Sequence, residues 1–387
     1  MRGSSAVFAL VDAAALILAT LTDGFETILL PRRINRRFRY SRLYYRSTWT
    51  LWRRAASALP VGRYRETTLG VFGPLSMLGL FISWITGLVL AFGLLQWSWA
   101  AEALHGPTAG LPADLYFSGT TFFTLGLGDI VPTSGPARAL TVVEAGLGFA
   151  FLAVIIGYLP VLYQAFSRRE VTISLMDARA GSPPTGGEAL VRLAQHGRGD
   201  AIDAMLREWE QWAAELLESH ISFPVLAFYR SQHANQSWLA ALATMLDACA
   251  LLLTEAQHAV AGSSHQAQLT FAMARHAAVD LSLIFGVRPC PPAVDRLPAE
   301  AHSALREALA RASPATAPEV ADQRLSEIRG MYEPFLAALA AYSLLSLPPV
   351  AFARSTADHW QRSPSMPRTP GIGSLPVDRS HGDHHFD

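Results

Sequence analysis

Hydrophobic residues gather in three long segments within the first 170 residues of the chain. Residues 69–99 carry no charge and residues 139–167 carry only Glu144, so each segment can cross a bilayer. Residues 6–30 are also mostly apolar and predict a third membrane helix. The pattern therefore predicts an all-α membrane protein.

Three acids interrupt the first apolar segment. A helix would place Asp12, Asp23 and Glu26 on one stripe. Because acids are costly in lipid, we expect the stripe to face protein or a headgroup layer. A helix lying flat in the interface is the alternative for residues 6–30. A cleaved signal peptide is not expected, because Asp12 interrupts the apolar core.

Residues 31–66 separate the first two apolar segments and hold eleven arginines. Their apolar positions share one helical stripe: Ile34, Phe38, Tyr45, Trp49, Trp52, Ala56 and Leu59. This pattern predicts a basic amphipathic interfacial segment, with anionic lipid as the partner of residues 31–65. Nucleic acid is not expected as a partner, because membrane segments lie on both sides.

Charge sets the expected orientation. The arginines before residue 67, together with Arg168 and Arg169, mark the cytoplasmic ends of the two later membrane segments. The loop between them is then extracytoplasmic. We expect a multi-pass protein of the cell inner (plasma) membrane, with its C-terminal region in the cytoplasm.

The rest of the 387 residues read as soluble. Residues 178–187 predict a linker, residues 188–346 a cytoplasmic helical domain, and residues 347–387 a disordered tail. The helices expected in this domain span about 188–220, 234–260, 265–286, 298–312 and 317–346.

The helical domain offers no catalytic constellation. It has no glycine-rich phosphate loop, nucleophile elbow or metal-ligand spacing, so no catalytic residue, cofactor or structural metal is expected. A membrane-anchored helical ligand-binding receptor or enzyme remains the rival from a different class.

The loop before the last membrane segment contains a run too short and irregular to span, TTFFTLGLGDIVP at residues 120–132. A dehydrated cation needs stacked oxygens, which backbone carbonyls supply if successive peptides point toward one axis. Gly126 and Gly128 suit the positive φ angles that this requires. Leu125 and Leu127 are expected to point away and pack against a pore helix.

We expect the backbone carbonyls of this run, together with the Thr124 hydroxyl, to form a ladder of ion-binding oxygens. Its members are Thr124, Leu125, Gly126 and Leu127. Asp129 at the outer mouth would attract cations and anchor the filter from behind. Residues 113–123 predict a short pore helix that begins near Pro112 and directs its C-terminal dipole at the ion path. One loop gives one wall, so a homotetramer is expected.

An outer helix, a pore helix, TxGxGD and an inner helix resemble the two-helix pore module of potassium channels over about residues 68–166. The string TLGLGDIVP is similar to the second filters of some two-pore-domain potassium channels. The resemblance implies a pore domain at 67–170, with a filter at 124–129. It also implies passive potassium-selective conduction by a non-enzyme, with K⁺ as the permeant ion.

In that family an aromatic residue usually stands where this chain has Leu127, and Val or Ile where it has Leu125. The aromatic ring packs into a cuff around the filter. Tyr116 and Phe117 occupy cuff positions on the predicted pore helix. A weakly selective monovalent cation channel is the alternative function.

The last membrane segment offers candidates for filter support and gating. Glu144 is expected behind the pore helix, hydrogen-bonded near Thr120 or Thr121. Gly148 lies where the family has a hinge glycine, with Gly146 and Gly157 as alternatives, and Pro160 would bend the helix. Ordinary close packing of small residues is the competing explanation for the glycines.

Overall fold

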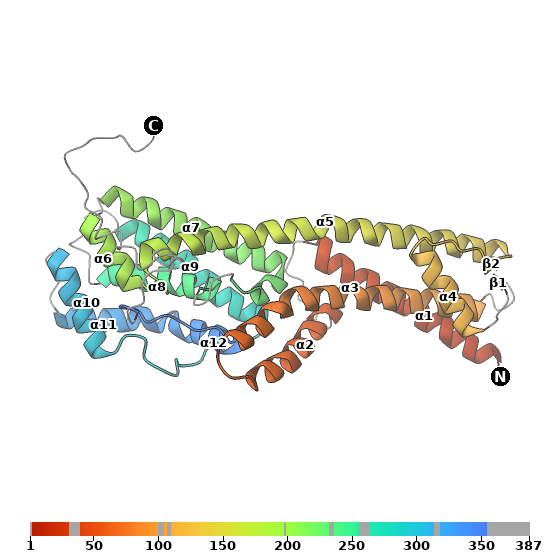
Figure 1. Ribbon diagram of the computed structural model, residues 1–387, viewed down its shortest axis with the longest axis horizontal. Coiled ribbons are helices and arrows are strands. Elements are labelled where there is room, and N and C mark those ends of the chain that lie inside the picture. Colours follow the sequence, from red (N-terminus) through yellow and green to blue (C-terminus); the bar gives the residue numbers. More distant parts are fainter. Residues whose placement is uncertain are drawn as a thin grey trace, which may run out of the picture. The chain divides into compact units, whose positions relative to one another are not determined.

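The computed structural model describes residues 2–30, 39–99, 104–106, 110–196, 199–231, 236–254, 264–312 and 318–353. The chain divides into two compact units. The first unit comprises residues 1–166 and 221–229, and the second comprises residues 167–220 and 230–387. Figure 1 colours both by sequence. Predictions for residues 31–38 and 354–387 fall outside the described residues.

The first unit is built from helices and one two-stranded ribbon. Its elements are α1 (Arg2–Gly24), the π-helical turn η1 (Phe25–Leu29), α2 (Tyr40–Ser57), α3 (Arg63–Trp99), β1 (Leu104–His105), α4 (Leu111–Phe122), β2 (Val131–Pro132), the start of α5 (Gly135–Ala180) and the 3₁₀ turn η2 (Pro224–Phe228). Three spans in the described residues are long and apolar enough to cross a membrane: Val7–Leu29, Tyr64–Ser98 and Gly135–Ala180. These candidate spans overlap the three predicted membrane segments, and crossing of a membrane by residues 6–30 stays a prediction.

The regular secondary structure of the second unit is helical in its described part. After the end of α5 it contains α6 (Gly186–His196), α7 (Gly199–Ser222), α8 (Trp238–Thr254), α9 (Ser264–Phe285), α10 (Ala299–Ala312), α11 (Pro318–Gly330) and α12 (Glu333–Ser343). Every residue of α8 is buried, so this apolar helix is the core of the unit. The predicted helix 317–346 is divided by a turn at residues 331–332, and α6 and α7 fall in the predicted helix 188–220.

Residues 178–187 were predicted to be a linker, but the structure shows the end of a helix followed by a buried turn. α5 continues to Ala180, and the turn after it is buried, with Thr185 fully inaccessible. A Cβ added to Gly187 would lie 2.4 Å from the Ala351 carbonyl oxygen. Glycine is needed because two backbones meet there. Residues 347–353, predicted as tail, are therefore partly core, and Val350 is 1% exposed.

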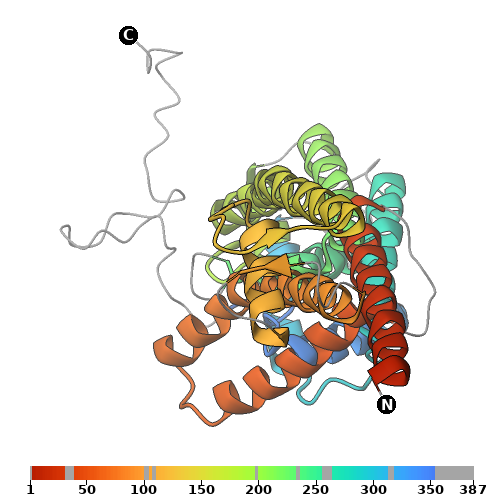
Figure 2. The same cartoon turned by 90° about the vertical axis from the view of Figure 1, so that its right-hand side faces the viewer.

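Asp23 joins the three N-terminal helices of the first unit. Its carboxylate accepts hydrogen bonds from the Ser41 amide at 3.1 Å, from the Ser41 hydroxyl at 3.0 Å and from the Trp84 indole at 3.0 Å. Ser41 lies in the first turn of α2, where unsatisfied amides and the helix dipole favour an anion. Glu26 lies 3.8 Å from Arg39, whereas Asp12 is exposed. The acidic stripe thus faces protein at two of its three positions, and Figure 2 shows α1 beside α3.

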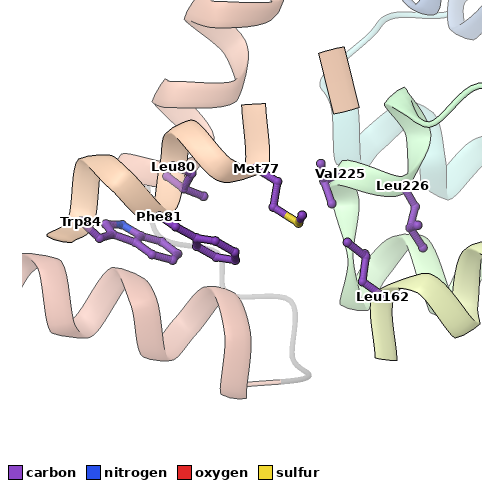
Figure 3. Packing of buried hydrophobic residues seen from close by; sticks show 7 residues of the cluster. All are labelled: Met77, Leu80, Phe81, Trp84, Leu162, Val225 and Leu226. Carbon is purple, nitrogen blue, oxygen red and sulfur yellow. The ribbon is translucent and has the colours of Figure 1, made fainter. Parts of the chain in front are cut away.

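A second apolar centre of the first unit receives η2. Met77, Leu80, Phe81 and Trp84 of α3, Leu162 of α5, and Val225 and Leu226 of η2 form one buried cluster, drawn in Figure 3. Phe228 completes this docking, with its ring centroid 4.8 Å from that of Trp49 and 5.1 Å from that of Phe72. The short segment Ile221–Tyr229 is thus part of the first unit, outside the cytoplasmic domain predicted to contain it.

The same packing corrects the expected role of the apolar stripe on α2. Trp49 and Ala56 are buried, and the Trp49 ring centroid lies 4.9 Å from that of Phe72 on α3. The stripe is used for packing within the protein, because α3 and η2 offer aromatic partners for it. Arg42 and Arg46 remain exposed on α2.

His220 is buried at the end of α7. Its Nδ1 lies 2.7 Å from the Leu216 carbonyl oxygen, and its ring lies 5.3 Å from that of Trp238. Burial, with a smaller contribution from the Arg169 charge, lowers the pKa of His220 to about 3. The imidazole is therefore neutral in the folded unit, with Nδ1 donating to Leu216.

The Asp23 network predicts a stability defect. Asp23→Asn removes the charge that accepts three hydrogen bonds, and charge-assisted bonds contribute about 1.5–3 kcal/mol each. We expect a lower melting temperature of the purified protein, measured by size-exclusion chromatography after heating. Asp12→Asn is the matched control, because Asp12 is exposed, and equal melting of both variants would contradict the assignment.

His220 predicts acid sensitivity of the second unit. An unfolded histidine has a pKa near 6.5, so between about pH 6.5 and about pH 3 the unfolded state binds more protons than the native state. Stability is then full above pH 6.5 and falls by up to about 1.4 kcal/mol per pH unit below it.

Hydrogen exchange of α7 and α8 at pH 7 and pH 5 measures this effect in the whole protein. His220→Phe keeps an aromatic ring and removes the titration, so it should lose less protection than the wild type at pH 5. Equal losses in the two proteins would exclude His220 as the cause.

Candidate ion-conduction site

The candidate site begins with α4, the helix predicted at 113–123 and present at 111–122. Gly110 precedes it at φ 98°, and Pro112 lies in its first turn, where the missing amide costs nothing. α4 packs closely against α3, because a Cβ at Gly93 would lie 2.7 Å from Leu115. The outer helix therefore fixes the position of α4 from behind.

The C-terminal end of α4 closes in a Schellman motif. The Thr124 amide donates to the Thr121 carbonyl at 2.9 Å, and the Leu125 amide donates to the Thr120 carbonyl at 2.8 Å. The residue that reverses the chain is Thr124, at φ 57°. Glycine usually occupies this position, because a left-handed conformation costs other residues about 1–2 kcal/mol. Thr124 is β-branched, so this backbone conformation is an outlier for its residue type.

Left-handed residues alternate through the candidate filter. Thr124, Gly126 and Gly128 have φ values of 57°, 58° and 79°, and the leucines lie between them. The two glycine conformations were predicted, whereas the one at Thr124 was not. The described part of the chain provides no hydrogen-bond donor to the carbonyl oxygens of residues 124–128. These oxygens are therefore available to a cation.

The segment is also held at its far end. Asp129 is exposed, accepts the Ile130 amide at 3.1 Å and interacts with the hydroxyl of Tyr116 on α4. Ile130 is buried against Ala113 and Phe117. β2 then pairs with β1 in antiparallel register, Leu104 opposite Pro132 and His105 opposite Val131. The irregular chain is thus fixed to α4 at both ends.

Two expected contacts around the candidate filter differ in the structure. Leu125 and Leu127 are 61% and 62% exposed, so they do not pack on the pore helix of their own chain. Phe117 faces Ile130 instead of forming a cuff, because the buried face of α4 is already covered by its own chain. Tyr116 is the only one of the two cuff candidates that reaches the segment, through Asp129.

Glu144 lies behind α4 and is fully buried. Its partners are the hydroxyl of Ser118 on α4 and the amide of Gln96 on α3, with the Gln96 Nε2 at 3.1 Å. The expected contact with Thr120 or Thr121 is wrong, since Thr120 donates to the Phe117 carbonyl of its own helix. An isolated glutamine in an otherwise apolar span was the sequence signal for Gln96.

The glycines of α5 have different surroundings. A Cβ at Gly148 would lie 2.0 Å from the Phe122 carbonyl oxygen, so close approach to the end of α4 explains this glycine. Gly146 and Gly157 have nothing within 4 Å of such a Cβ in the described chain. α5 continues as helix through Gly148 and Pro160. Hinge roles for Gly148, Gly157 and Pro160 stay predictions.

Comparison with known proteins finds similarity in the same part of the chain. Residues 80–164 match the family model described as "Ion channel", which confirms the predicted resemblance for this part of the chain. Residues 80–164 thus resemble an ion channel domain, within a predominantly helical chain that has three candidate membrane spans in its described part.

Two relatives cover parts of the chain. The uncharacterized membrane protein YdjJ of Bacillus subtilis is 28% identical over 186 residues, 46% of this chain and 53% of that protein. Two-pore potassium channel 4 of Arabidopsis thaliana is 39% identical over 64 residues, 16% of this chain and 22% of that protein. The chain therefore spans about half of the first relative and about a fifth of the second. No solved structure matches it at a significant level.

The contact of Gly148 with α4 predicts a strong effect of a single methyl group. Gly148→Ala places a Cβ against backbone atoms of Phe122, which cannot rotate away. We expect a loss of about 1–3 kcal/mol in stability, with loss of ion flux. Thermal stability in detergent and flux in liposomes measure the two effects.

Gly157→Ala is the matched control and should leave stability unchanged, because nothing surrounds that position. If Gly148→Ala is as stable as this control, the packing explanation is wrong. A stable Gly148→Ala protein with altered opening would support the hinge instead.

Proposed function

We propose that this protein conducts K⁺ passively through a selectivity filter formed by residues 124–129. The observation that carries the proposal is the alternation of left-handed residues at Thr124, Gly126 and Gly128, directly after a helix that points its C-terminus at them. Unpartnered carbonyls replace the water of a dehydrated cation, and the helix dipole favours positive charge there. Transport needs no chemical conversion of the ion.

A homotetramer follows from the single copy of this segment. One chain supplies one wall of carbonyls, and four chains enclose an ion. The exposed apolar residues support the same assembly. Leu125 and Leu127 are exposed, and so are Val142, Phe149, Leu152 and Ile156 on α5. Such exposed apolar residues fit neighbouring subunits or lipid, and the two filter leucines fit only a neighbouring subunit.

The membrane arrangement is part of the same proposal. Arginines precede Tyr64–Ser98 and follow the predicted span of α5, which favours a cytoplasmic second unit and a plasma-membrane location. Arg42 and Arg46 on α2 are exposed and suit anionic headgroups. Because the apolar stripe of α2 is covered by protein, lipid contact there would be mainly electrostatic.

A weakly selective cation channel is the second candidate. The observation that favours it is Leu127, which is 62% exposed and brings no aromatic ring to brace the segment. A less tightly braced ladder discriminates less between ions of different radius.

Reversal potentials of the purified protein in planar bilayers test both candidates. With K⁺ on one side and Na⁺ on the other, the proposal predicts a reversal close to the K⁺ equilibrium potential. Equal permeability would favour the second candidate, and absence of any current would overturn both.

Gly126→Ala supplies the negative variant for this experiment. A Cβ at φ 58° strains the carbonyl ladder, so current should be lost while the assembly persists on size-exclusion chromatography. Gly135→Ala is the matched control at the start of α5, where a Cβ meets nothing within 4 Å in the described chain, and it should conduct.

A further inference from the structure

The contact between α4 and α5 has two parts, one helical turn apart on both helices. Glu144 of α5 bonds Ser118 of α4, and Gly148 of α5 lies against the Phe122 carbonyl of α4. Residues four apart share a helix face, so the two contacts together fix the register of α5 on α4. α4 leads directly into Thr124, and this register therefore sets where the candidate filter begins.

The hydrogen atoms available at Glu144 can be counted. The Ser118 oxygen approaches two acceptors, a Glu144 carboxyl oxygen and, at 2.8 Å, the Val89 carbonyl oxygen of α3. A serine hydroxyl carries one hydrogen and can donate to only one of them. The Gln96 amide supplies a donor to the other Glu144 oxygen. With an ionised Glu144, one close oxygen–oxygen contact at Ser118 would contain no hydrogen.

A neutral carboxylic acid removes this deficit. Glu144 then donates to the Ser118 oxygen, Ser118 donates to Val89, and Gln96 donates to Glu144. Glu144, Ser118 and Gln96 are 0%, 0% and 1% exposed, and none of the described residues forms a salt bridge with Glu144. An ionised acid at membrane depth would need such a cation or water, whereas a neutral acid needs neither.

We propose that Glu144 is held as a neutral acid that donates its proton to Ser118, and that it acts as a positioning residue for the candidate filter. The proposal deepens the proposed function and rests on it for the role in conduction. The hydrogen-bond chain Gln96–Glu144–Ser118–Val89 joins outer helix, inner helix and pore helix. The filter entrance is thereby tied to both membrane helices without a buried charge.

Infrared spectroscopy of the whole protein in liposomes tests the protonation state independently of conduction. The carbonyl band of a protonated carboxylic acid should be present in the wild type and absent in Glu144→Gln. Asp114→Asn, which removes another buried carboxyl on α4, should keep the band. Absence of the band from the wild type, or its survival in Glu144→Gln, would overturn the neutral acid.

Currents in planar bilayers test the positioning role. In Glu144→Gln the side-chain amide can donate to Ser118 and accept from Gln96, so K⁺ current and selectivity should stay within about twofold of wild type. Glu144→Asp is shorter by one methylene, and Ser118→Ala removes the acceptor. Both should lower current or selectivity by about tenfold, equivalent to about 1.4 kcal/mol and comparable with one lost hydrogen bond.

The two readouts separate the possible failures. If Glu144→Gln is as defective as Glu144→Asp, the side chain acts as a charge and the proposal is wrong. If all variants conduct like the wild type, Glu144 does not position the filter. A third outcome is an infrared band in the wild type with no current from the wild type or any variant. Glu144 is then a neutral acid, and the proposed function is wrong.

Discussion

The proposed conduction requires that the carbonyl oxygens of residues 124–128 stay without hydrogen-bond donors from the protein, and none of the described residues donates to them. Irregular backbone in a bilayer is tolerated where it lines a polar path. Here the amides of Thr124 and Leu125 turn back to α4, so the helix end is satisfied while the next carbonyls are not. Asp129 and Ile130 then bind the segment back to the same helix. Residues 124–130 are thus held to α4 at both ends.

The two best-buried acids in the membrane spans connect helices. Asp23 ties α1 to α2 and α3 through amide, hydroxyl and indole donors, and Glu144 ties α5 to α3 and α4. Neither forms a salt bridge within the described residues. The two acids differ in the donors that surround them. Asp23 accepts from three donors near the N-terminus of α2, which suits an anion. Glu144 faces the Ser118 hydroxyl, whose one hydrogen can be donated to the Val89 carbonyl.

The sequence predicts the parts of this protein that depend on local pattern. The length of the apolar segments predicts the three candidate spans, and Pro112 predicts the start of α4. The positions of Gly126 and Gly128 predict two of the three left-handed residues. The left-handed Thr124 could not be predicted, because threonine disfavours that conformation and only the Schellman bonds to Thr120 and Thr121 impose it.

The hydrogen-bond partner of Glu144 on α4 could not be predicted from the sequence, for a different reason. Helical periodicity says that Glu144 faces inward but does not give the register of α5 against α4. That register depends on Gly148, whose missing side chain lets the backbones meet at Phe122. A shift of one turn would have placed Glu144 nearer Phe122 than Ser118. Pairing with Thr120 or Thr121 was therefore a reasonable but wrong expectation.

The insertion of Ile221–Tyr229 into the first unit limits how the chain can be divided. In this segment Val225, Leu226 and Phe228 are at most 6% exposed, and they pack on α2, α3 and α5. The chain on both sides belongs to the second unit. A fragment of residues 188–346 would therefore carry an apolar segment deprived of its partners, which favours aggregation. The first unit thus takes part of its core from Ile221–Tyr229, a segment far along the chain from its other residues.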